Sequence, residues 1–157
     1  MPPRPRPVLL PLLLLALACP AATEPEARPV TPVNAEKGLA LHGYDPVAYF
    51  TDGRAVPGLA EHSLQHAGAT WRFATAEHQG LFQADPERFL PRYGGYCAYA
   101  MSKGRLADVD PDDFAVVDGH LYLNNNALIH AWWTVGRSER IGAADANWAA
   151  WPKAPVQ

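Results

Sequence analysis

Apolar and polar positions alternate in some segments of this chain with the period of a β-strand. The alternation covers residues 62–66 and 70–73, and the glycine-centred connection between them predicts a β-hairpin. A second hairpin is predicted over 114–123, where two apolar runs flank Asp118 and Gly119. The residues expected on the inward face of the first hairpin are Leu64, Trp71 and Phe73.

Helices are predicted after the first hairpin from cap residues and from apolar spacing. Thr75 is the expected N-cap of a helix over 76–84. Asp85, followed by Pro86, is the expected cap of a short helix that ends near Pro91. The apolar face of the first of these helices should carry Leu81 and Phe82.

The C-terminal part of the chain predicts two further helices. Asn124–Asn126 form a candidate cap for a helix over 127–134, which Gly136 ends. A last helix over 137–148 should dock Ile141 and Trp148 on the core. The sequence therefore predicts an α+β fold: a single small domain of two β-hairpins interleaved with short helices, with the C-terminal helix docking on the core.

The first residues have the layout of a secretory signal peptide. Arg4 and Arg6 precede an apolar run over 8–17, and small residues follow it. The run is too short to span a bilayer, which needs about 20 residues. We expect a signal peptide over 1–18, with cleavage as late as residue 22, and therefore an exported, periplasmic protein.

The segment after the apolar run allows a second form of the exported protein. Residues 16–19 (ALAC) resemble a degenerate bacterial lipobox, so Cys19 either lies beside the cut or carries a lipid anchor on the periplasmic side. Residues 19–37 are rich in Pro, Ala, Glu and Thr and predict a flexible tether. The folded domain is predicted over 38–152.

Composition and charge exclude some classes of partner. Removing residues 1–18 takes away Arg4 and Arg6 and no acidic residue, so the net charge falls from −3 to −5. A mildly acidic chain with scattered charges predicts binding neither to nucleic acid nor to anionic lipid. The membrane contact that the sequence predicts is therefore the lipid anchor at Cys19 alone.

Cys97 is the single cysteine of the predicted domain, in a run over 93–100 that is rich in glycine and tyrosine. An unpaired thiol in an oxidising compartment is a liability unless it is buried, binds a metal or is used chemically. As a thiolate it would be a soft ligand or a nucleophile; as a thiol it would be a small buried hydrophobe. No CxxC, HExxH or Walker motif in the sequence decides between these roles.

Six histidines are scattered along the chain, and His42 alone stands in an otherwise apolar segment. It shortly precedes Tyr44 and Asp45, so these three residues are candidates to join Cys97 at a metal ion. Asp45 also stands before a proline, which suits an Asx turn. The other histidines are expected to be solvated, and His78 is expected to project from a helix surface.

Several short motifs follow one another along the predicted domain. They are residues 42–50 (HGYDPVAYF), 68–73 (GATWRF), 85–88 (DPER), 93–98 (YGGYCA), 118–119 (DG), 121–124 (LYLN) and 144–148 (ADANW). In this order they resemble the exported YHS-domain proteins of bacteria, and the resemblance covers nearly everything from Gly38 to Trp148.

The resemblance implies a small metal-binding module, and copper-handling proteins are among the settings in which such domains occur. It implies Cys97 as the leading ligand. Some exported relatives are described as selenoproteins, which implies redox chemistry at the cysteine position. The chain departs from the family by carrying Glu61-His62-Ser63 where the name-giving Tyr-His-Ser triplet is expected. It also lacks the second and third cysteines of the metal-binding relatives.

The sequence leaves three functions open. The first is a carrier or sequestering module for copper or another soft ion, held by Cys97 with His42 and with Tyr44 or Asp45. The second is a module that binds an exported partner protein or a small apolar ligand, with Cys97 merely buried. The third is a thiol redox enzyme in which Cys97 cycles through a sulfenate or a mixed disulfide.

Overall fold

The computed structural model describes Met1 and residues 33–152 of the chain. The fold is α+β in a single small domain, as the sequence predicts. The predicted signal peptide, its cleavage sites, Cys19 and most of the tether fall within residues 2–32, outside the described part. Within the described part, no helix is long and apolar enough to cross a membrane.

The first hairpin forms one side of a four-stranded sheet. The strands β3 (Leu59–His66) and β4 (Ala69–Phe73) pair antiparallel, as predicted. Two short strands extend the sheet beyond β4 in the order β1-β2-β4-β3, namely β1 (Ala35–Glu36) and β2 (Leu39–Ala40). Alternate residues of β4 are buried, so Trp71 and Phe73 lie in the core as expected.

The folded domain begins before residue 38, which corrects the predicted end of the tether. Val33 is buried, Asn34 donates its backbone N–H to Gly94 O at 2.8 Å, and β1 pairs with β2. The sequence predicts a tether here because the segment has hardly any large apolar side chains. The place of Asn34 in the fold depends on Gly94 and Gly95, about 60 residues away.

Short helices lie between β2 and β3 and after β4. They are η1 (Leu41–Gly43), α1 (Ala48–Thr51), α2 (Ala76–Ala84) and α3 (Pro86–Phe89). Thr75 caps α2 by accepting the backbone N–H of His78 at 3.1 Å, as predicted. Asp85 is the N-cap residue of α3 with Pro86 in its first turn, as predicted, although its side chain makes no cap bond. One expectation was wrong: Leu81 is exposed, and Phe82 alone of that pair is buried.

The second half of the domain is built on the second predicted hairpin. Its strands are β5 (Asp110–Val117) and β6 (His120–Asn124), and its helices are η2 (Arg92–Gly95), α4 (Ala98–Ser102), α5 (Ala127–Thr134) and α6 (Arg137–Ala150). Asn126 caps α5 by accepting the N–H of Ile129. Ile141 and Trp148 of α6 pack against the core, as predicted.

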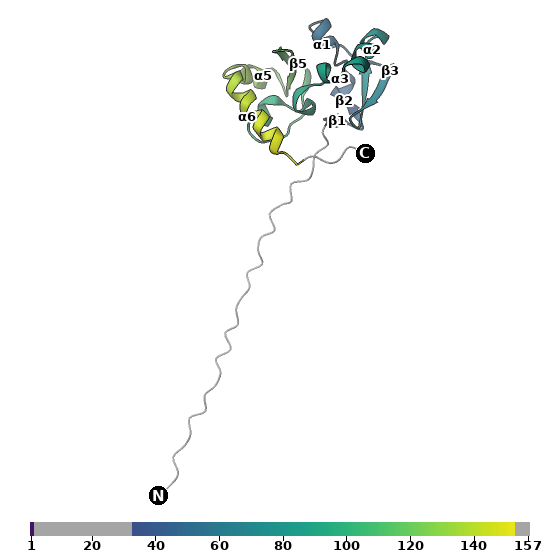
Figure 1. Cartoon of the computed structure of the whole chain (residues 1–157). Coiled ribbons are helices and arrows are strands. Elements are labelled where there is room, and N and C mark those ends of the chain that lie inside the picture. The colour runs from purple at the N-terminus through teal and green to yellow at the C-terminus, as the bar shows by residue number, and fades with distance from the viewer. Residues whose placement is uncertain (2–32, 153–157) are drawn as a thin grey trace.

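The core has two clusters, one in each half of the domain. The larger cluster packs Trp71, Phe73 and Phe82 around the first sheet and includes Cys97. The smaller one packs Tyr93, Tyr122 and Trp133 beneath α6. In Figure 1, β1–β3 with α1–α2 lie at one end of the domain, and β5 with α5–α6 lie at the other. The segment from η2 to α4, which holds Cys97, connects the two halves.

Candidate functional site

Cys97 lies at the N-terminal end of α4 and is buried with its side chain in the larger core cluster. Its backbone N–H donates to Ala107 O at 3.0 Å. Its thiol is free of any disulfide and points at the side-chain oxygen of Asn124, with Sγ and Oδ1 3.8 Å apart. The thiol is therefore enclosed in the protein with one polar neighbour at hand.

Asn124 links this thiol to an imidazole. It ends β6 and is fully buried, and its Oδ1 also accepts the backbone N–H of Tyr99 at 3.3 Å. Its Nδ2 lies 3.3 Å from Nδ1 of His130 on α5, so the amide donates and the imidazole accepts. Sequence reasoning treated Asn124 as part of a helix cap and His130 as solvated, and so missed this chain of three polar groups.

His42 is paired elsewhere. Its Nε2 lies 2.9 Å from Oδ1 of Asp108, and its Nδ1 lies 3.8 Å from Glu36. Burial alone would raise the pKa of Asp108. The hydrogen bonds from Asn34, from the backbone of Val109 and from His42 outweigh that effect and lower this pKa.

His42 and Cys97 are nevertheless tied to one stretch of chain. Asp108, the partner of His42, directly follows Ala107, whose carbonyl accepts the N–H of Cys97. Tyr44 is partly buried and packs against the core cluster that contains Cys97. Residues 107 and 108 therefore link the backbone of Cys97 to the side chain of His42, and His42 is committed to a carboxylate there.

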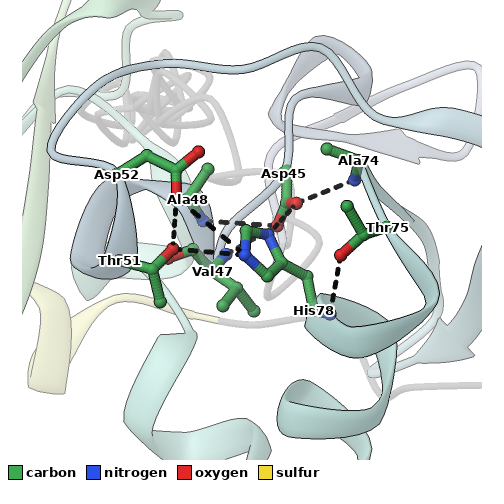
Figure 2. Close-up of polar contacts among 8 residues, drawn as sticks. All are labelled: Asp45, Val47, Ala48, Thr51, Asp52, Ala74, Thr75 and His78. Carbon is green, nitrogen blue, oxygen red and sulfur yellow. Dashed lines mark hydrogen bonds and ion pairs between the residues drawn. The ribbon is translucent and has the colours of Figure 1, made fainter.

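Asp45 is fully buried and both of its carboxylate oxygens are occupied (Figure 2). Oδ1 accepts the N–H of Val47 at 2.8 Å and that of Ala48 at 3.4 Å. Oδ2 accepts the N–H of Ala74 at 2.8 Å and lies 2.6 Å from Nδ1 of His78. Asp45 therefore closes the Asx turn that its sequence context suggests, and it ties α1 to α2.

His78 does not project into solvent, which corrects the sequence-based expectation. Its side chain is only 13% exposed, because it turns inward to donate Nδ1–H to the buried carboxylate of Asp45. Its Nε2 then faces Thr51 Oγ1 at 3.3 Å and Asp52 Oδ1 at 4.0 Å (Figure 2). Thr51 Oγ1 also lies 2.8 Å from Asp52 and 3.2 Å from Val47 O, so its proton has other acceptors.

These positions bear directly on the predicted metal ligands. Within residues 33–152, no three His, Cys, Asp or Glu side chains gather where one ion could bind them. The thiol of Cys97 and the imidazole of His130 are donors that suit a soft ion, but the amide of Asn124 stands between them. Metal binding at Cys97 stays a prediction, and as arranged the donors do not form a coordination shell.

The largest hollow described in the domain lies away from Cys97. It is a groove of about 720 Å³ where β4, η2 and α6 meet. Its apolar walls include Trp71, Leu90, Pro91, Tyr93, Trp148 and Ala149. A site that is mostly apolar with a few polar groups is the usual form of a small-molecule site.

A compact polar cluster forms one side of this groove. Arg92 donates to Oδ1 of Asp145 at 2.9 Å, and the hydroxyl of Tyr93 donates to the same oxygen at 3.0 Å. Burial and the Asp145 carboxylate raise the pKa of Tyr93 above its ordinary value. Burial also raises the pKa of Tyr122 beneath the cluster. These phenols therefore stay protonated at neutral pH, and the hydroxyl of Tyr93 is the donor to Asp145.

Comparison of the chain with family models, with curated proteins and with solved structures gives no match.

Proposed function

We propose that this chain is an exported binding module that holds a small, flat, apolar organic molecule in the groove between β4, η2 and α6. The observation that carries the proposal is the groove itself, whose aromatic walls meet the Arg92–Asp145–Tyr93 cluster. Trp148 is a partly exposed ring of this wall, and such a ring buries apolar area and stacks on flat ligands. The polar cluster then orients the polar end of the same molecule.

The chemistry of the lining favours binding over catalysis. No Ser, Thr or Cys side chain is among the residues described as lining the groove, so the groove offers no aliphatic hydroxyl or thiol as a nucleophile. Tyr93 is held in its neutral form by the raised pKa and does not act as a base. Cys97 lies in the core and is not a lining residue either.

The test uses a flat neutral fluorophore, N-phenyl-1-naphthylamine, and the processed chain without its predicted signal peptide. Ala149 lines the groove from an exposed position on α6, so Ala149→Phe fills the groove without removing any buried side chain. We expect this variant to bind the probe about tenfold more weakly. Ala146→Phe is the matched control, since Ala146 is an exposed alanine of the same helix that is not a lining residue.

Two further variants locate the bound probe. Trp148→Ala should weaken binding as well, because it removes a wall of the groove. Trp132→Ala should leave binding to the groove unchanged, since Trp132 is an exposed tryptophan of α5 outside it. Equal affinity in wild type, Ala149→Phe and Trp148→Ala would overturn the proposal.

A soft metal ion at Cys97 is the second candidate function. It is favoured by one observation, the contact of Cys97 Sγ with Asn124 Oδ1, whose amide in turn contacts His130. The resemblance to exported YHS-domain proteins also makes the thiol the leading ligand. An ion would have to displace the Asn124 amide to reach both donors, since first-shell bonds are about 2.0–2.3 Å.

The test of this candidate loads the processed chain with Cu(I) under reducing conditions and measures the retained copper. About one ion per chain is expected, and Cys97→Ser should abolish retention. His130→Gln should weaken it more than His42→Gln, because His42 is committed to Asp108. A wild-type protein that retains no copper after loading rules this candidate out.

A further inference from the structure

One face of α5 exposes an apolar stripe that the groove does not use. Leu128, Trp132 and Val135 are 59%, 50% and 73% exposed. Leu128 and Trp132 stand one turn apart on the same side of α5, and Val135 directly follows the last residue of this helix, Thr134. A soluble protein rarely leaves such side chains contiguous and uncovered unless they bind something.

Cations border this stripe. Nζ of Lys103 and Cζ of Arg140 lie 5.8 and 4.9 Å from the ring centroid of Tyr99, and that ring lies 6.3 Å from the ring of Trp132. Arg140 also donates its Nε–H to Val135 O. Among the described residues, neither cation has a carboxylate within ion-pair distance.

A small hollow of about 190 Å³ lies beside the same cations. Ser102, Lys103, Glu139 and Arg140 are among its lining residues. Two cationic groups and a hydroxyl outnumber the single carboxylate, so the hollow suits an anionic oxygen-rich group such as a phosphate. The apolar stripe and a site for a phosphate group thus lie side by side on one surface.

We propose that this surface docks on a phospholipid bilayer that contains anionic lipid. Trp132 and Leu128 would lie at the boundary between headgroups and acyl chains, where tryptophan is favoured. Lys103 and Arg140 would contact lipid phosphates, and each cation near an anionic bilayer strengthens binding. This docking is independent of the groove and of a lipid on Cys19.

The alternative of a second copy fits the surface less well. Three side chains offer far less than the roughly 800 Å² that each partner contributes to a stable interface. A symmetric contact through the stripe would also bring Lys103 and Arg140 of both copies together, and like charges repel. A bilayer needs no large complementary area and supplies the opposite charge.

The test measures binding of the processed chain to lipid vesicles, with Cys19→Ser so that no lipid is attached. The two kinds of vesicle are pure phosphatidylcholine and phosphatidylcholine with phosphatidylglycerol. We expect binding to the anionic vesicles at low salt, weakened by high salt. Trp132→Ala should lower the partition coefficient about tenfold and Lys103→Gln about fivefold.

Matched controls distinguish vesicle binding through this surface from non-specific binding. Leu81→Ala removes an exposed leucine of α2, and Arg54→Gln removes an exposed cation elsewhere, so both should bind like wild type. Fluorescence of Trp132, obtained as the difference from Trp132→Phe, should be quenched by brominated lipid. The proposal is overturned if the anionic vesicles do not bind the chain, or if the controls weaken binding as much as Trp132→Ala. Either result would favour a protein partner as the ligand of the stripe.

Discussion

Replacing Asp45 distinguishes a structural carboxylate from a metal ligand. The side chain is fully buried, and four groups donate to it: the backbone N–H groups of Val47, Ala48 and Ala74, and the imidazole of His78. If Asp45 has this structural role, its substitution lowers the free energy of unfolding with or without copper present. If it is a ligand, its substitution lowers copper retention first.

The magnitude follows from the donors that each variant leaves without an acceptor. In Asp45→Asn the remaining side-chain oxygen can still accept the backbone N–H groups of Val47 and Ala48. The new NH₂ group faces the N–H of Ala74, so that N–H loses its acceptor. A buried donor without a partner costs about 1–3 kcal/mol, and a hydrogen bond to a neutral acceptor is weaker than one to a charged acceptor. We expect a loss of about 2–4 kcal/mol.

Asp45→Ala should cost more, about 3–6 kcal/mol, because every donor loses its acceptor. Losses of this size are large against the roughly 5–15 kcal/mol that stabilises a typical domain. Asp52→Asn is the matched control. Asp52 is 33% exposed and lies 4.0 Å from His78 Nε2, so its loss should cost below about 1 kcal/mol.

The assay is urea unfolding followed by tryptophan fluorescence, with the free energy of unfolding obtained by linear extrapolation. The control and wild type should unfold together, and Asp45→Asn should unfold at clearly lower urea. A value for Asp45→Asn within about 1 kcal/mol of wild type would refute the reasoning, since four donors cannot lose a buried carboxylate at so small a cost.

Three further predictions follow from burial and from pKa directions. Cys97 should react with a disulfide reagent far more slowly in the native than in the unfolded protein, because the thiol is buried; equal rates would contradict this. The lowered pKa of Asp108 stabilises the fold above the ordinary carboxyl pKa of about 3.9, and this is lost as pH falls through the native value. Asp108→Asn should therefore lose less stability between neutral pH and acid than wild type, and parallel losses would count against it. Burial and Asp145 raise the pKa of Tyr93, so its folded form stays protonated while the unfolded phenol ionises near pH 10. Stability should fall above that pH less steeply in Tyr93→Phe, as measured by thermal unfolding.

The local elements could be predicted because their causes are local. The hairpin of β3 and β4 follows from alternation around a glycine turn, and α2 follows from the Thr75 cap. His78 shows where this reasoning stops. It stands on the first turn of a helix, where an imidazole usually contacts solvent. It turns inward because the carboxylate of Asp45, 33 residues earlier, is buried and accepts a hydrogen bond from it.

The net charge of the chain likewise does not show where its charges gather on the surface. The net charge of the chain is negative, and the cations Lys103 and Arg140 are 37 positions apart. The fold places both beside the ring of Tyr99, which lies next to Trp132. A local cationic surface within an acidic chain therefore becomes visible only when α4 and α6 are seen together.

In the sequence His42 alone stands out as a candidate ligand and the other histidines are expected to be solvated, whereas the fold gives His42, His78 and His130 separate partners. His78 serves Asp45 and His42 serves Asp108, so both are held by carboxylates. His130 instead accepts a hydrogen bond from a neutral amide, that of Asn124, which also touches the thiol of Cys97. Moving His130 toward an ion would cost one neutral hydrogen bond, about 1 kcal/mol, whereas moving His42 would take a donor from Asp108. A soft ion at the thiol would therefore recruit His130 before His42, although only His42 stands out in the sequence.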